Sequence, residues 1–160
     1  VQSALKLNVS MLTVHTGGGR AMLEAAKESA KKDLILLGVT LLTSIGAEDM
    51  AEACILGTPA EAVACRASLA ASCGLGGIVC SPKEITNVRA IIGPSMVLVT
   101  PGIRPAGSDV GDQKRAASPE SAIADGADYL VVGRPITAAE EPAKAAAIII
   151  ESIAKGLLKR

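Results

Sequence analysis

The hydrophobic positions of this chain fall into short, continuous apolar runs that alternate with longer segments of helical periodicity. Five runs have the length and the aliphatic content of strands. Because each run is apolar throughout rather than alternating, we expect parallel strands buried on both faces beneath helices. The runs are MLTVH (11–15), LILLGVT (34–40), GIVCS (77–81), MVLVT (96–100) and YLVVG (129–133).

The intervening segments carry helix-start signals. Thr58-Pro59-Ala60-Glu61 predicts a capping box with proline at the first helical position, and Ser81-Pro82-Lys83-Glu84 predicts the same kind of start. The predicted helices cover residues 19–32, 58–74, a segment after Glu84, 118–126 and about 140–158. Repeated strand–helix units leave two architectures open, an open doubly wound sheet or a (β/α) barrel. No linker interrupts the pattern, so residues 1–160 are expected to form a single domain.

Charge and composition exclude several classes of partner. Lys+Arg and Asp+Glu both number 16, so no overall field attracts nucleic acid or a membrane surface. One Tyr and no Phe or Trp leave no aromatic platform on which bases could stack. No apolar run reaches the roughly 20 residues of a membrane helix, and the first residues show no signal-peptide pattern. These features predict a cytoplasmic protein.

The cysteines give no sign of a metal site. Cys54, Cys65, Cys73 and Cys80 form no CxxC pair, and the chain has a single histidine, His15. We therefore expect no metal and interpret the four as reduced cysteines that mostly pack in the core. His15 is the default general-base candidate, but without a neighbouring carboxylate a structural role is favoured over catalysis.

Candidate chemistry lies at the carboxyl ends of the predicted strands, where both architectures bind ligands. Two consecutive ends combine a glycine with an arginine: Arg104 in TPGIR, and Gly133-Arg134 in VVGRPIT. Exposed backbone N–H groups together with a guanidinium fork suit a phosphate dianion. The pattern predicts a phosphate site, with Gln113 and Thr43 as further candidate contacts.

Several motifs in the same order resemble the C-terminal half of the orotidine 5′-phosphate decarboxylase family. They are TVHTGGGRAML, GVTLLTS, GIVCSPKE, TPGIRP, GDQ and GADYLVVGRPIT, between about Leu7 and Ser152. The resemblance implies an α/β fold of the (β/α)8 TIM barrel family, here an N-terminally truncated barrel with about five parallel strands. It also implies a cofactor-independent homodimer that converts orotidine monophosphate to uridine monophosphate and CO2 in pyrimidine synthesis.

The resemblance gives each candidate residue a role. The Gly133 N–H and the Arg134 side chain would hold the 5′-phosphate, and Arg104 lies in the loop that closes on it. Gln113 would reach the phosphate from that loop and meet the pyrimidine side. Thr43 would hydrogen-bond the base.

One part of the family pattern is not in this sequence. The family's catalytic Asp-x-Lys-x-x-Asp motif does not occur in the 160 residues. We expect this Lys/Asp motif to lie upstream of Val1, so that no catalytic residue is predicted within the chain itself. A chain of this extent should bind a nucleotide phosphate with little turnover and leave two open sheet edges. Two alternatives remain, a non-catalytic nucleotide- or phosphate-binding half-barrel and a related sugar-phosphate decarboxylase.

Overall fold

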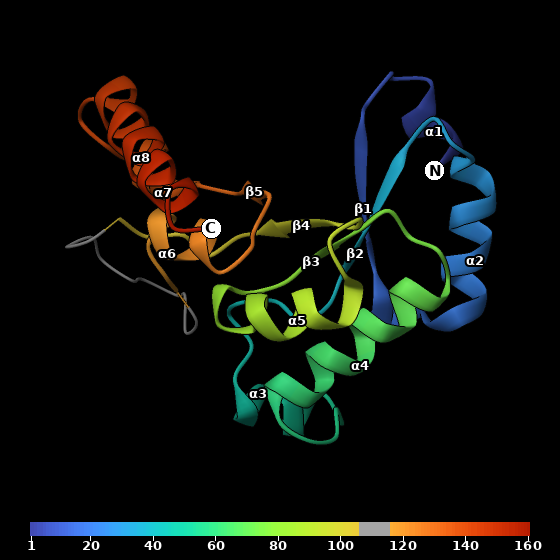
Figure 1. Ribbon diagram of the computed structural model, residues 1–160. Helices are drawn as coiled ribbons and strands as arrows, with labels where there is room; N and C mark the ends of the chain where they lie inside the picture. The colour runs from blue at the N-terminus through green and yellow to red at the C-terminus, as the bar shows by residue number, and fades with distance from the viewer. Residues whose placement is uncertain (106–115) are drawn as a thin grey trace.

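The computed structural model describes residues 1–105 and 116–160 (Figure 1). Its strands form one parallel sheet in the order β1-β2-β3-β4-β5. A doubly wound sheet reverses its strand order at a switch point, whereas an unbroken sequential order is that of a barrel wall. The observed strand order therefore indicates a (β/α) barrel wall rather than a doubly wound sheet. The strands are β1 (Met11–His15), β2 (Ile35–Val39), β3 (Gly77–Val79), β4 (Val97–Thr100) and β5 (Tyr129–Leu130).

The predicted helices are present within a few residues of their expected limits, and three short ones were not predicted. The unpredicted helices α1, α3 and α7 span four to six residues, too few to show a helical repeat in the sequence. The helices are α1 (Gln2–Leu5), α2 (Gly19–Ala30), α3 (Ala47–Glu52), α4 (Pro59–Ser72), α5 (Ile85–Ile92), α6 (Pro119–Ala124), α7 (Arg134–Thr137) and α8 (Pro142–Leu157), with 3-10 turns η1 (Thr16–Gly18) and η2 (Pro82–Glu84).

The two predicted helix starts differ in outcome. At α4 the capping box is complete, because Glu61 N–H donates to Thr58 Oγ1 at 3.2 Å and Thr58 N–H donates to Glu61 Oε2 at 2.8 Å. The second start was wrong in detail. Ser81 Oγ accepts from Lys83 N–H at 3.3 Å, two residues on, and this local turn opens η2 before α5 begins.

The core lies between the sheet and its helices. Leu36, Ile78 and Leu98 sit on one side of the central strands, are at most 1% exposed, and join one cluster with Val63 of α4 and Val88 of α5. Figure 1 shows α2, α4 and α5 flanking the sheet along β1 to β4, with α6 and α8 at the β5 end. This layering places the helices on the outer side of a barrel wall.

The expectation that every strand is buried on both faces was wrong for the outer strands. On the central strands the second face is covered, with Leu37 at 4%, Val39 at 8% and Val99 at 7% exposure. At β5 and directly after it, by contrast, Tyr129 is 53% and Val131 52% exposed. In the described sheet β1 and β5 each have a hydrogen-bonded neighbour on one side only, as the predicted open edges require. The same one-sided pairing accounts for a β5 of two residues where five were predicted.

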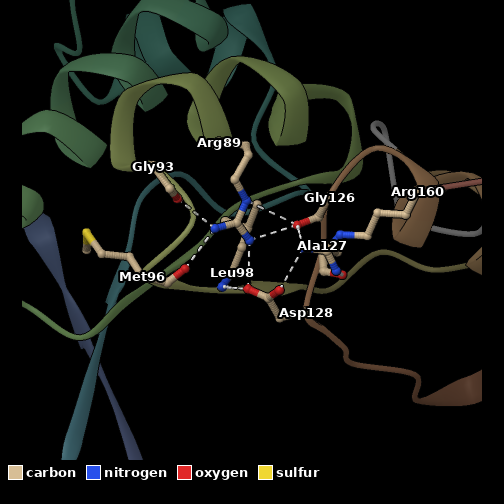
Figure 2. Close-up of polar contacts among 8 residues, drawn as sticks. All are labelled: Arg89, Gly93, Met96, Leu98, Gly126, Ala127, Asp128 and Arg160. Atoms are coloured by element: carbon tan, nitrogen blue, oxygen red, sulfur yellow. Dashed lines mark hydrogen bonds and ion pairs between the residues drawn. The ribbon is translucent and has the colours of Figure 1, made fainter. Parts of the chain in front are cut away.

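An arginine of α5 holds together the amino ends of β4 and β5 (Figure 2). The Arg89 guanidinium donates to the carbonyls of Gly93 at 2.9 Å, Met96 at 2.8 Å and Gly126 at 2.8 Å. It also pairs with Asp128 Oδ2 at 2.6 Å, although the two residues are 39 positions apart. One side chain therefore fixes the turn after α5 and the turn before β5 at the same time.

The carboxylate of Asp128 completes this cluster. It accepts the Leu98 N–H at 2.8 Å and pairs through Oδ1 with Arg160 Nη2 at 3.0 Å. Burial by itself would raise the pKa of Asp128. The hydrogen bonds from Leu98 N–H, Arg160 and Arg89 outweigh that effect and hold its pKa below the ordinary value of 3.8.

A carboxylate with a lowered pKa stabilises the fold above its unfolded-state pKa, and this contribution is lost as the pH falls through the folded-state pKa. We therefore expect Asp128→Asn to lower the free energy of unfolding at pH 7. The difference in free energy of unfolding between the variant and wild type is expected to narrow below about pH 4. Urea unfolding of both proteins across this range measures the gap. A gap that stays constant down to about pH 2 would contradict the assignment. The control is Glu24→Gln, which removes a carboxylate from an exposed ion pair with Arg20 and is expected to change the free energy of unfolding little at any pH in this range.

Candidate functional site

The carboxyl ends of all five parallel strands meet at one edge of the sheet, and the predicted site residues follow three of them. Thr43 comes after β2, Arg104 after β4, and Gly133-Arg134 after β5. Gln113 lies outside the described residues. Four of the five predicted residues are thus placed on the edge where α/β proteins bind ligands.

Gly133 and Arg134 present an open corner after β5. Gly133 precedes α7 and accepts the Ile136 N–H at 2.9 Å, and a Cβ built on it would meet nothing within 4 Å. The Arg134 side chain begins α7 and is exposed. A small anion can therefore approach the backbone at Gly133 and pair with the neighbouring Arg134 guanidinium.

The backbone around Arg104 is held in place, and the Arg104 side chain hydrogen-bonds to the preceding residue. Gly102 adopts φ +77°, Ile103 is fully buried, and the Arg104 N–H donates to Ala117 O at 2.9 Å. Its guanidinium donates through Nη1 to the carbonyl of Ile103 at 2.8 Å. This bond uses one of the five N–H groups of the guanidinium.

Thr43 lies in the turn after β2 and is 8% exposed. The end of β2 is fixed by Arg66 of α4, whose Nη1 donates to Thr40 O at 2.6 Å. Sequence reasoning did not select Arg66, because nothing local distinguishes it from a solvated helix arginine. Its role is to hold the strand end from which the Thr43 turn departs.

The remaining candidates are placed as follows. His15 ends the outer strand β1 with an exposed side chain, and the glycines after it form η1 and the start of α2. Cys73 and Cys80 are buried, but Cys54 and Cys65 are exposed, so packing explains only two of the four cysteines. In residues 1–105 and 116–160, no three His, Cys, Asp or Glu side chains gather as metal ligands would.

The first residue of the chain has a structural role. Val1 is the N-cap of α1, where its carbonyl accepts the Ala4 N–H at 2.9 Å and the Leu5 N–H at 3.1 Å. Its side chain is partly buried and packs against the core cluster. The location of the Lys/Asp motif upstream of Val1 stays a prediction, because nothing in the structure tests it.

Comparison with known sequences identifies the family. Residues 1–149 match the profile described as "Orotidine 5'-phosphate decarboxylase / HUMPS family". The chain belongs to this family. It is 52% identical over 144 residues to the orotidine 5′-phosphate decarboxylase of Hydrogenovibrio crunogenus, covering 88% of this chain and 61% of that protein. With the Halorhodospira halophila enzyme it shares 49% identity over 156 residues, covering 96% of this chain and 66% of that one.

Solved structures agree on the fold. The crystal structure of orotidine 5′-phosphate decarboxylase from Lactobacillus acidophilus superposes with a TM-score of 0.79 at 34% identity, over 95% of this chain and 66% of that one. The predicted family and barrel fold are confirmed. The chain spans about 61–66% of the length of these curated relatives. Across the described ranges, no helix has the length and apolarity needed to cross a bilayer.

Proposed function

We propose that this chain forms the phosphate- and base-binding part of an orotidine 5′-phosphate decarboxylase of pyrimidine biosynthesis. The reaction is cofactor-independent cleavage of a carbon–carbon bond, which converts orotidine monophosphate to uridine monophosphate and CO2. The observation that carries the proposal is the 49–52% identity to curated decarboxylases over most of the chain. The placement of Thr43, Arg104 and Gly133-Arg134 at one sheet edge supports it.

The Gly133–Arg134 corner is the proposed 5′-phosphate site. The open space beside Gly133 admits the phosphate to the backbone N–H groups, and the exposed Arg134 guanidinium supplies a charge-assisted pair. Arg104, which follows β4, is proposed as a second cation for the same phosphate. Gln113 remains a predicted contact of both the phosphate and the pyrimidine.

Thr43 is the proposed base contact, because a nearly buried hydroxyl discriminates strongly between ligands that do and do not pair with it. Thr43→Ala is expected to weaken uridine 5′-monophosphate binding by about 1 kcal/mol, roughly five-fold, and to leave ribose 5-phosphate binding unchanged. Isothermal titration with both ligands measures the two effects. If ribose 5-phosphate loses as much affinity as the nucleotide, Thr43 does not contact the base.

Catalysis is proposed to need groups outside the 160 residues, upstream of Val1, since no Asp-x-Lys-x-x-Asp occurs among them. The chain by itself is therefore proposed to bind the nucleotide with little turnover, because preorganised charges supply most of an enzyme's rate enhancement. We further propose a cytoplasmic homodimer, in which the open edges at β1 and β5 are covered.

The experiment that tests the proposal compares two phosphate ligands. Titration of the chain with uridine 5′-monophosphate and with ribulose 5-phosphate is expected to show preference for the nucleotide. A preference for ribulose 5-phosphate would favour a sugar-phosphate enzyme of the same fold. Binding of neither ligand by folded chain would overturn the phosphate site.

A further inference from the structure

Helices α6 and α8 lie side by side at the β5 end of the sheet, and they touch at a glycine (Figure 1). Gly156 is buried near the end of α8, where a Cβ built on it would lie 2.5 Å from Glu120 O and 2.9 Å from Ile123 Cβ. Both distances are well below the separation of about 3.5 Å at which such atoms pack. Glycine weakens a helix relative to alanine, so this contact gives a reason for its presence.

A second contact joins the same two helices one turn earlier in α8. Ser152 Oγ accepts the Glu120 N–H at 3.1 Å. The first N–H groups of a helix have no partner within it, and in α6 the N-cap Ser118 takes that of Ser121. Ser152 therefore completes the cap of α6 from a different helix.

The start of α6 is tied directly to Arg104. Ala117 lies two residues before Pro119, the first residue of α6, and its carbonyl accepts the Arg104 N–H at 2.9 Å. Pro105, the next residue after Arg104, lines the same pocket as Ser152, so α8 also lies beside the other side of this pairing. The position of Arg104 therefore depends on where α6 rests against α8.

The end of α8 is held from a second direction. Arg160 pairs with Asp128 at 3.0 Å and donates to Ala127 O at 3.3 Å, in the turn before β5. Asp128 is itself fixed by Arg89 at 2.6 Å. Retreat of α8 from a side chain at position 156 would break these bonds, so we expect α6 to move instead.

We propose that Gly156 is a positioning residue for Arg104, because it lets α8 seat the first turn of α6 at its observed place. From there the Ala117 carbonyl holds the Arg104 backbone on the ligand-binding edge of the sheet. A side chain at position 156 displaces α6 and Arg104 with it, while Gly133 and Arg134 follow β5 and keep their place. The effect needs no contact between Gly156 and the ligand. This inference rests on the proposed function, in which Arg104 is a second cation for the phosphate.

The test is Gly156→Ala, measured for stability and for the binding of three ligands. Alanine in place of an unconstrained helix glycine raises the Tm, so a lowered Tm is the expected sign of the tight contact. Affinity for uridine 5′-monophosphate and for ribose 5-phosphate is expected to fall about five-fold, because one charge-assisted bond to the phosphate is weakened. Uridine, which has no phosphate, is expected to bind as it binds wild type.

Two further variants separate positioning from general destabilisation. Ala30→Gly lowers the Tm from the buried end of α2, at the opposite end of the sheet, and should leave all three affinities unchanged (Figure 1). Ser152→Ala removes the cap contact without inserting atoms, and a smaller loss of affinity for the two phosphate ligands is expected from it. Ser152→Ala takes the place of Gly156→Ala in the comparison if the latter does not fold.

A double-mutant cycle tests whether the effect passes through Arg104. In an Arg104→Ala background Gly156→Ala is expected to cause no further loss of nucleotide affinity, whereas in an Arg134→Ala background it keeps its full effect. An unchanged or raised Tm for Gly156→Ala, wild-type nucleotide affinity in the folded variants, equal losses for nucleotide and uridine, or an undiminished loss in Arg104→Ala would each overturn the inference alone. Failure of folded wild type to bind the nucleotide would overturn the proposed function and this inference with it.

Discussion

Replacing Arg89 by alanine is expected to lower the free energy of unfolding by about 3 kcal/mol. The Arg89 side chain is only 18% exposed, and its guanidinium donates to three carbonyls and to the carboxylate of Asp128. Its removal leaves these acceptors at the amino ends of β4 and β5 without their donor. Removing one partner of a largely buried ion pair is strongly destabilising, because the remaining carboxylate of Asp128 stays in place without its counter-charge. Urea denaturation at neutral pH measures the loss.

The matched control for Arg89 is Arg20. Arg20 pairs with Glu24 at 3.5 Å, with side chains 54% and 55% exposed, and donates to Ser72 Oγ at 3.0 Å and Cys73 Sγ at 3.6 Å. Because these contacts are exposed or weak, Arg20→Ala should cost much less than Arg89→Ala. Arg89→Lys should recover only part of the loss, because an ammonium cannot reproduce the planar fork that reaches several carbonyls. Equal losses for Arg89→Ala and Arg20→Ala would show that the cluster is not a determinant of stability.

Arg134→Ala is expected to weaken binding of uridine 5′-monophosphate by about 2–3 kcal/mol, roughly 30- to 150-fold. The side chain is exposed, so the reason is the loss of a charge-assisted phosphate contact and not a change in the fold. Titration with the nucleotide measures the effect, and the circular dichroism spectrum and Tm should match those of wild type.

Two comparisons make the Arg134 result specific. Lys144→Ala removes another exposed cation, which pairs with Glu141 on the surface, and should leave nucleotide affinity unchanged. Uridine should bind Arg134→Ala as it binds wild type, since it carries no phosphate. Unchanged nucleotide affinity in Arg134→Ala would remove Arg134 from the phosphate site.

The sequence was most informative where the physics is local. Continuous apolar runs located all five strands, and Thr58 with Glu61 located the start of α4, because periodicity and capping act over a few residues. Register with the next strand is not local. For this reason the extent of β5 and the exposure of Tyr129 and Val131 were not predicted.

The candidate site shows the same division. The glycine–arginine pairs after the fourth and fifth strands were visible in the sequence, and the structure places Arg104 and Gly133-Arg134 at one edge. The bond from Arg104 to Ile103 O and the unpaired hydroxyl of Thr100 depend on side-chain conformation, which no motif encodes. Arg89 and Asp128 are 39 positions apart, and only the fold reveals that they meet.

The half-exposed ring of Tyr129 has a practical consequence for spectroscopy. The chain has one Tyr and no Trp or Phe, so its aromatic absorbance and intrinsic emission arise from a single phenol on the outer strand β5. Absorbance at 280 nm will therefore be very weak for the mass of protein, and concentration is better measured from the peptide bond. In return, the emission is a built-in local probe, because any process that covers or releases β5 changes the solvent around the only fluorophore in the chain.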